Sequence, residues 1–101
     1  VEEYVVKNFA NSGACIGEAA EEIGVSKRKL SEAFTKTKNM SFVSYLTKFR
    51  IDKAKEYLLS DRYSIKEISK MVGIENDTYF YKIFKRDIGV TPMEYRINHS
   101  K

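Results

Sequence analysis

The side chains best suited to chemistry in this sequence are polar, mostly basic, and gathered near residues 27–36 and 77–86. A helix over the first segment that buries Leu30, Ala33 and Phe34 turns its other residues to solvent. These outward residues are Lys27, Arg28, Lys29, Ser31, Glu32, Thr35 and Lys36. Those of the second segment are Asp77, Thr78, Tyr81, Lys82, Lys85 and Arg86. Because such side chains bind phosphates and the edges of bases, the pattern favours a nucleic-acid ligand.

Charge is spread unevenly along the chain. The 101 residues have a formal net charge of +4. Residues 26–55 hold nine bases and two acids, a net +7, whereas residues 1–25 come to −4. Residues 56–80 come to −2 and residues 81–101 to +3. Separate basic and acidic surfaces are typical of a protein that binds a polyanion, although many soluble helices also have a charged outer face.

Other kinds of site find little support in the residues. The one histidine, His99, lies near the C-terminal end, and the acids after Gly17 fit a solvated helix face. The one cysteine, Cys15, cannot form an internal disulfide or a Cys/His zinc finger, and indicates a reducing compartment. We therefore expect no enzyme, no metal site, no cofactor and a cytoplasmic location. No apolar run approaches the ~20 residues of a membrane span, so we expect no membrane partner.

Apolar residues recur at helical spacing almost throughout, which predicts an all-α fold of about seven helices. Four of the predicted helices span about residues 2–8, 16–23, 41–59 and 76–87. Two more begin after Ser26 and after Ser64, and the last runs from Thr91 through Ile97. The helix over residues 41–59 is a rod of roughly 28 Å. The residues predicted to face inward are Val5, Val6, Phe9, Ile16, Ala19, Ala20, Ile23, Leu30, Ala33, Phe34, Phe42, Tyr45, Leu46, Phe49, Ala54, Tyr57, Leu58, Ile65, Ile68, Met71, Val72, Tyr79, Phe80, Ile83 and Phe84.

Capping residues punctuate this pattern. Ser26 and Ser41 are suitable N-caps, and Ser64 with Glu67 has the spacing of a capping box. Thr91 with Glu94 repeats that box, with a proline at the first helical position.

The two halves of the chain repeat each other. At an offset of 49 residues, six positions of the first half pair with six of the second: Ile16, Glu18, Ala20, Ile23, Gly24 and Val25 with Ile65, Glu67, Ser69, Val72, Gly73 and Ile74. At an offset of 50, four more pair: Leu30, Phe34, Ser41 and Tyr45 with Phe80, Phe84, Thr91 and Tyr95. Each copy is a short helix, a glycine turn and a second helix. This is the layout of a helix-turn-helix, whose second helix enters the DNA major groove.

A known family has the same arrangement of residues. The stretches that carry the likeness are Gly24-Val25-Ser26, Leu30, Phe34, Tyr45-Leu46, Arg50-Ile51, Lys53-Ala54-Lys55, residues 65–73, Tyr79-Phe80, Phe84-Lys85, Gly89-Val90-Thr91-Pro92 and Glu94-Tyr95-Arg96. Over about residues 14–97 they resemble the DNA-binding module of AraC/XylS-type transcription regulators, most specifically from Tyr79 to Arg96. The resemblance implies two helix-turn-helix subdomains that are joined by the central helix and enter successive major-groove faces, about one turn or ~34 Å apart.

The resemblance also implies which residues contact DNA. Carried over by position, the base-contacting candidates are Arg28, Ser31, Glu32, Asp77, Thr78, Tyr81 and Lys82. The phosphate candidates are Ser26, Lys27, Lys29, Lys36, Ser41, Lys85, Arg86 and Thr91. For Ser26, Ser41 and Thr91 the contact would be made by backbone donors at the helix start, the alternative being a cap that only stabilises its helix.

We thus expect one DNA-binding domain over residues 1–101, with a first subdomain at about 1–40, a linker helix at about 41–59 and a second subdomain at about 60–98. Its expected partner is double-stranded DNA, with RNA polymerase as a further one. Its expected role is transcription regulation by activation. The closing stretch is also similar to family members fused to a phosphorylated receiver, so a receiver or sensor domain is expected on the N-terminal side. The alternative is a helical protein–protein interaction module, whose binding would depend less steeply on salt.

Three positions depart from the family pattern. Ile74 stands where an aromatic residue is usual, and Asn39 stands where the second copy has Gly89. Cys15 pairs with Ser64 and is therefore predicted to be a poor N-cap, because a thiol is a weak acceptor. The alternatives for Cys15 are a redox role and a tolerated small residue, and we expect the tolerated small residue.

Overall fold

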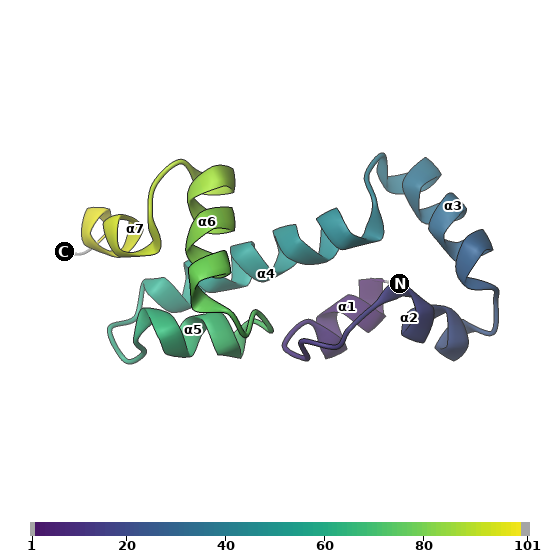
Figure 1. The fold of residues 1–101 in the computed structure, drawn as a ribbon, viewed down its shortest axis with the longest axis horizontal. Helices are drawn as coiled ribbons and strands as arrows, with labels where there is room; N and C mark the ends of the chain where they lie inside the picture. Colours follow the sequence, from purple (N-terminus) through teal and green to yellow (C-terminus); the bar gives the residue numbers. More distant parts are fainter. Residues whose placement is uncertain (1, 100–101) are drawn as a thin grey trace.

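The chain folds into helices only over residues 2–99, which are the residues that the computed structural model describes. In this range there are seven helices and no strands (Figure 1). They are α1 (Glu2–Asn8), α2 (Ile16–Ile23), α3 (Lys27–Lys38), α4 (Phe42–Leu58), α5 (Ile65–Met71), α6 (Asp77–Ile88) and α7 (Pro92–Asn98). The predicted all-α class, with two helix-turn-helix units on a long central helix, is confirmed. The helix α4 has 17 residues, about 25 Å, slightly shorter than predicted.

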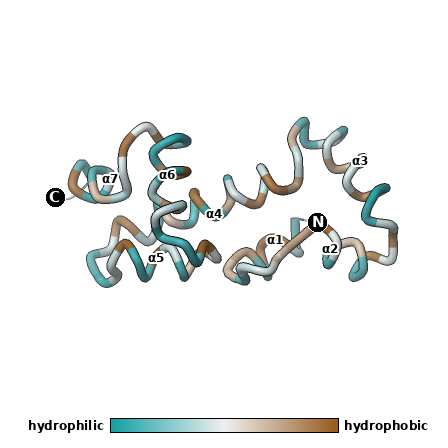
Figure 2. Tube along the Cα trace, in the orientation of Figure 1, coloured by the Kyte–Doolittle hydropathy of each residue, from teal (hydrophilic) through white to brown (hydrophobic). Residues whose placement is uncertain are grey.

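Two hydrophobic cores lie along α4 in an elongated body of 46 × 22 × 22 Å (Figure 1). The first half of α4 contributes Phe42 and Leu46 to a core with α1, α2 and α3. Its second half contributes Ile51, Ala54 and Leu58 to a core with α5 and α6. Apolar and polar residues are therefore mixed along every helix, and the apolar residues are not concentrated in a single helix (Figure 2). The central helix is the common spine of both halves.

Side-chain caps set the helix starts as the sequence predicts. The hydroxyls of Ser26 and Ser41 accept hydrogen bonds from backbone N–H groups three residues on. Complete capping boxes form at Ser64 and at Thr91. Cys15 is the N-cap of α2 but makes no side-chain cap hydrogen bond, as expected for a thiol.

The helix ends follow the same local chemistry. Asn39 ends α3 with a φ of 58°, and Gly89 ends α6 at the equivalent place with a φ of 95°. Asparagine is one of the few side chains that tolerates this left-handed conformation. The departure at Asn39 therefore keeps the turn.

The capping boxes predict a stability loss in acid. Hydrogen bonds from the backbone and side chain of Ser64 hold the pKa of Glu67 below its ordinary value of 4.5, and Thr91 does the same for Glu94. The stabilisation from these carboxylates is complete above about pH 4.5 and is lost as the pH falls through their lower folded-state pKa. At pH values below 4.5 we expect the melting temperature to decrease. The decrease should be smaller in a Glu67→Gln/Glu94→Gln variant, because its amide oxygens accept the same hydrogen bonds without titrating. Thermal melts followed by circular dichroism between pH 7 and pH 3 measure this.

A matched control is Glu22→Gln on the exposed side of α2, away from both boxes. It should leave the acid response of the protein unchanged. Equal acid responses in the unchanged protein and the double variant would contradict the prediction.

Four residues predicted to face inward are exposed, and the prediction was wrong for each. Val6 is 58%, Ile23 50% and Tyr79 53% exposed, and Ala33 is also exposed. In α1 the buried pair is Tyr4 and Val5, because the Tyr4 hydroxyl donates to Glu18 and accepts from the backbone N–H of Cys15. In α3, Leu30 and Phe34 make the packing, and Ala33 borders a shallow hollow beside α1. Helical spacing alone does not tell which edge of an apolar stripe meets a partner.

Half-buried arginines bind the loops of both halves. Arg50 of α4 donates through Nε to the carbonyl of Phe9 at 2.8 Å and through Nη2 to that of Asn11 at 2.9 Å. Arg96 of α7 donates through Nε to the carbonyl of Leu58 at 3.1 Å and through Nη2 to that of Ser60 at 3.0 Å. The acceptors differ by the same 49 residues as the repeat. The loop after α1 is thus the structural equivalent of the loop after α4.

No helix in the described part of the chain combines the length and the apolar character needed to cross a membrane.

Candidate nucleic-acid interface

Two helix pairs have the geometry of a helix-turn-helix. The helix α2 ends at Gly24 before α3, and α5 is followed by Gly73 before α6. The second helix of each pair has 12 residues, about 18 Å. Each is held by a narrow buried stripe, Leu30 and Phe34 in α3 and Phe80, Ile83 and Phe84 in α6. Each therefore presents its opposite side to solvent.

In α3 all the predicted contact residues are exposed. Arg28, Ser31 and Glu32 lie on one face, since three- and four-residue steps return to the same side of a helix, and Thr35 continues the row. Arg28 and Glu32 form an ion pair, with 3.2 Å between Nε and Oε1, and their side chains are 89% and 67% exposed. Glu32 therefore lies where it can orient the Arg28 side chain. This role differs from accepting a hydrogen bond from a base.

The basic residues beside that face divide into two groups. Lys27, Lys29 and Lys36 are exposed around the outer side of α3. Lys38, at the end of the helix, is instead bound to Glu2 of α1, and this ion pair raises the pKa of Lys38 and lowers that of Glu2. The first three keep their charge available to a ligand, while Lys38 joins α3 to α1.

In α6 the same register recurs 50 residues on. Thr78, Tyr81, Lys82 and Lys85 are exposed at the places of Arg28, Ser31, Glu32 and Thr35. Asp77 is half-buried in the first turn, so it is less accessible than the other candidates. Arg86 is bound to Asp87 with 2.8 Å between Nε and Oδ1, and this hydrogen bond raises the pKa of Arg86.

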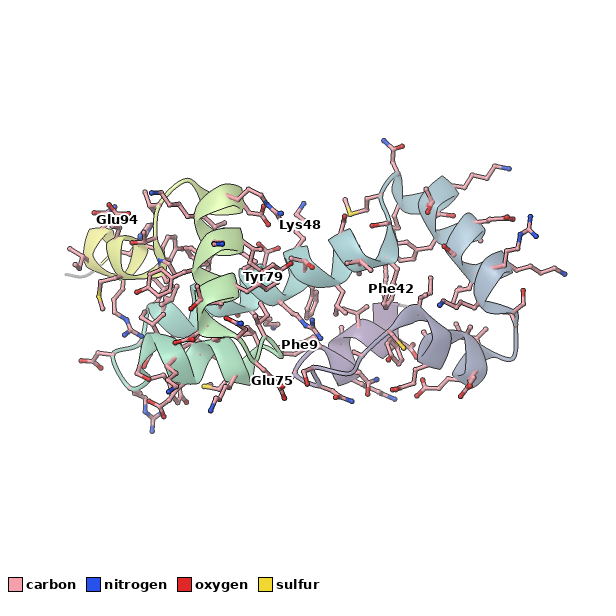
Figure 3. The ribbon with its side chains drawn as sticks, in the orientation of Figure 1. Phe9, Phe42, Lys48, Glu75, Tyr79 and Glu94 are labelled. Atoms are coloured by element: carbon pink, nitrogen blue, oxygen red, sulfur yellow. The ribbon has the colours of Figure 1, made fainter. Side chains whose placement is uncertain are left out.

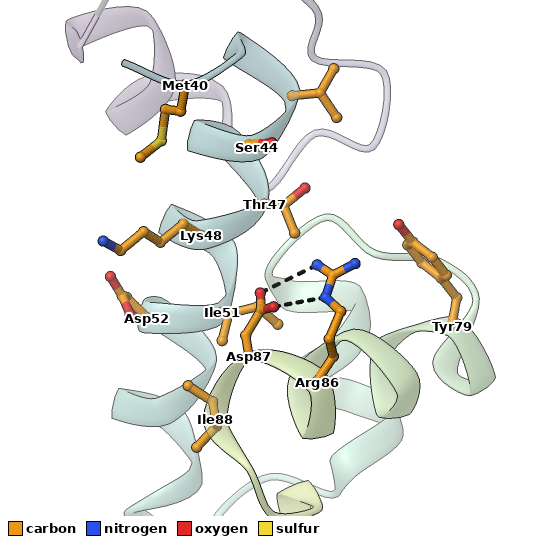
Figure 4. A pocket seen from close by; sticks show the side chains of 11 residues that line it. Met40, Ser44, Thr47, Lys48, Ile51, Asp52, Tyr79, Arg86, Asp87 and Ile88 are labelled. Atoms are coloured by element: carbon orange, nitrogen blue, oxygen red, sulfur yellow. Dashed lines mark hydrogen bonds and ion pairs between the residues drawn. The ribbon is translucent and has the colours of Figure 1, made fainter. Parts of the chain in front are cut away.

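A hollow of about 730 Å³ separates α6 from the first half of α4 (Figure 4). Tyr79 and Arg86 line it from α6, and Lys48 lines it from α4. Figure 3 shows Lys48 and Tyr79 on neighbouring elements of this region. Neither Lys48 nor Tyr79 is among the contact residues predicted from the sequence. The sequence signal that could have identified Lys48 is its place in the segment 26–55, which has a net charge of +7. Tyr79 was predicted to face inward.

The capping candidates already use their side-chain acceptors. The Ser41 hydroxyl accepts from the N–H of Ser44, and the Thr91 hydroxyl accepts from that of Glu94, each at 3.1 Å. Ser26 accepts in the same way from Lys29. A phosphate at these helix starts would accept hydrogen bonds from backbone N–H groups, and a capping hydroxyl that accepts one of these bonds still has an O–H group to donate. Within residues 2–99 no cluster of three His, Cys, Asp or Glu could hold a metal ion.

Comparison with known proteins gives consistent similarities. A family profile described as a helix-turn-helix domain matches residues 19–98. The chain is 30% identical over 93 residues to the xylose operon regulatory protein of Escherichia coli K12. The match covers 92% of this chain but only 24% of that protein. The chain thus spans about a quarter of the length of this curated relative.

Two solved structures have the same fold. The C-terminal domain of AraT, a response regulator from Geobacillus stearothermophilus, has a TM-score of 0.92 and 36% identity over 98% of this chain and 82% of that one. The DNA-binding domain of the transcriptional factor AdpA, solved in complex with a target DNA, has a TM-score of 0.88 and 18% identity over 96% of this chain and 86% of that one.

Proposed function

Because this chain belongs to the AraC/XylS-type helix-turn-helix family and is a DNA-binding domain of a transcription regulator, we propose that it reads two adjacent major-groove sites, one with α3 and one with α6. The observation that carries the proposal is the shared register of the two exposed rows, on helices joined by one 17-residue spine. A body 46 Å long can reach two major-groove faces one turn, ~34 Å, apart.

Each row has its own part in this proposal. Arg28 pairs with a guanine, Glu32 orients Arg28, and Ser31 contacts a neighbouring base. In the second copy Thr78, Tyr81 and Lys82 read bases, with Asp77 at the edge of the contact. The phosphate contacts are Lys27, Lys29, Lys36, Lys85 and Arg86, with backbone donors after Ser26, Ser41 and Thr91. To bind a phosphate, the Arg86 guanidinium must first release the Asp87 carboxylate.

The wider context belongs to the same proposal. The domain comprises a first subdomain at about residues 1–40, the linker helix and a second subdomain at about residues 60–98. It acts in the cytoplasm as the output module of a longer regulator, with a receiver or sensor domain on its N-terminal side and RNA polymerase as a partner in activation. Two facts support a longer regulator: the chain matches only 24% of the xylose operon regulatory protein, and AraT, whose C-terminal domain has this fold, is described as a response regulator.

The test is a selection of random DNA duplexes with the purified domain. The expected result is a motif of two boxes with centres about one helical turn apart, 10–10.5 base pairs. A single enriched box would contradict the use of both helices. No enrichment would favour the alternative of a protein–protein interaction module.

Arg28→Ala is expected to relax specificity at one position of the first box. A bidentate arginine–guanine pair discriminates by about 1–3 kcal/mol, roughly 5- to 150-fold. Titration against duplexes with each of the four base pairs at that position measures the effect. The control is Lys36→Ala on the same helix, which should weaken all four duplexes alike, and equal behaviour of the two variants would refute the division between base and phosphate contacts.

A further inference from the structure

The two halves of the domain meet at a small polar junction around Arg50, in the middle of α4. Its guanidinium is half-buried and holds the carbonyls of Phe9 and Asn11, in the loop that follows α1. Burial lowers the pKa of Arg50, but a guanidinium stays charged in proteins. The Phe9 side chain packs against both hydrophobic cores. Arg50 therefore fixes the loop whose Phe9 side chain reaches both cores.

The turn between α5 and α6 lies directly on this junction. Gly73 has a φ of +86°, and a Cβ atom there would lie 2.2 Å from the carbonyl oxygen of Phe9 and 3.0 Å from Nε of Arg50. The same turn is braced by Ser69, whose buried hydroxyl donates to the carbonyl of Ile74. A hydrogen bond of 3.1 Å from the Ser12 hydroxyl to Oε1 of Glu75 adds a second link between the loops. The second recognition helix is thus seated against the first half through the atoms that Arg50 orders.

Arg96 makes an equivalent fork but does not connect the halves. Its acceptors are the carbonyls of Leu58, Ser60 and Tyr63, all at the end of α4 or in the loop before α5. An arginine that binds loop carbonyls is therefore common to both copies. Of these two arginines, Arg50 is the one that lies against the glycine turn of the other copy.

We propose that Arg50 determines which spacing between the two DNA boxes the domain accepts. The inference rests on the proposed function, since it requires both recognition helices to bind. One base pair more or less shifts the second box by about 3.4 Å and turns it by about 35° around the DNA axis. A domain whose halves are locked together cannot follow this change, whereas one connected by α4 alone can bend towards it.

The first experiment measures affinity for duplexes whose boxes, taken from the selection, are separated by the selected spacer or by one or two base pairs more or fewer. We expect the unchanged domain to lose at least about tenfold in affinity for each altered spacer, comparable to one or more mismatched base pairs. We expect Arg50→Met to lose about threefold or less, with unchanged affinity for a duplex that carries the first box alone. The matched control is Arg62→Met, which removes an exposed arginine outside the junction and should keep the profile of the unchanged domain.

The second experiment follows the junction without DNA. Spin labels on Glu22→Cys in α2 and Lys66→Cys in α5, both exposed positions, report the distance between the halves in a Cys15→Ser background. Arg50→Met is expected to broaden this distance distribution and Arg62→Met to leave it narrow. Arg50→Lys, which keeps the charge but lacks the fork, is expected to give an intermediate result and replaces Arg50→Met if that variant does not fold.

The outcomes separate this inference from the proposed function. A folded Arg50 variant with the spacer profile and the distance distribution of the unchanged domain overturns the role of Arg50. An unchanged domain that binds no two-box duplex overturns the proposed function instead, and the spin-label distances still decide whether Arg50 locks the halves.

Discussion

Replacing Phe84 by alanine is expected to destabilise the domain by about 3–5 kcal/mol, the usual range for removing a buried aromatic ring. Phe84 is 0% exposed. Its ring centroid lies 5.8 Å from that of Phe80 and 5.7 Å from that of Tyr95, so the ring connects α6 to α7. The surrounding side chains come from α4, α5 and α6 and are held by helix packing, which limits how far the cavity can collapse.

Urea denaturation of Phe84→Ala, followed by circular dichroism, measures the free energy of unfolding. The matched control is Lys82→Ala, two residues away on the exposed side of the same helix. Its stability should change by no more than about 0.5 kcal/mol, although its DNA affinity should fall. A loss below about 1.5 kcal/mol in Phe84→Ala would contradict the assignment of this ring to the core.

DNA binding is expected to weaken by about 500-fold when the salt concentration rises from about 50 to about 200 mM. Five basic side chains are proposed to neutralise phosphates, and each neutralised phosphate contributes about −0.9 to the slope of log K against log salt. The expected slope is therefore about −4.5 for the contacts of Lys27, Lys29, Lys36, Lys85 and Arg86. Fluorescence anisotropy titrations of a labelled duplex at several salt concentrations measure it.

Single substitutions divide that slope among the residues. Lys36→Ala should reduce its magnitude by about 1. Lys38→Ala is the matched control, because Lys38 is already neutralised by Glu2, and it should leave the slope nearly unchanged. A slope near zero would count against phosphate contacts as the basis of binding, and equal effects of the two variants would count against the assignment of Lys36.

Most of the architecture was predictable because its signals are local. The caps at Ser26 and Ser41 and the capping boxes at Ser64 and Thr91 act within one helical turn, so residue type and spacing suffice to find them. The repeat at an offset of 49 to 50 residues is likewise a property of the chain alone. The Arg28–Glu32 pair was also within reach, since it has the four-residue spacing of neighbours on a helix.

The errors concern partners rather than elements. Ile23 and Tyr79 have apolar character and helical spacing, yet their side chains are 50% and 53% exposed. Ile51 is 1% exposed but was not among the residues predicted inward, because α4 turns its second half towards a different core from its first. A single apolar stripe does not describe a helix shared by two cores.

The sequence by itself determined the helices, their starts, the duplicated helix-turn-helix and the exposed rows from Arg28 and from Thr78, because these depend on neighbours within a few residues. Only the tertiary structure decided that Arg50 holds the loop at Phe9 and that Gly73 packs on the same atoms. These contacts join residues 41 and 64 positions apart in the chain, through backbone carbonyls that carry no sequence signal. They lie between segments that are far apart in the sequence, so they appear only when the chain is folded.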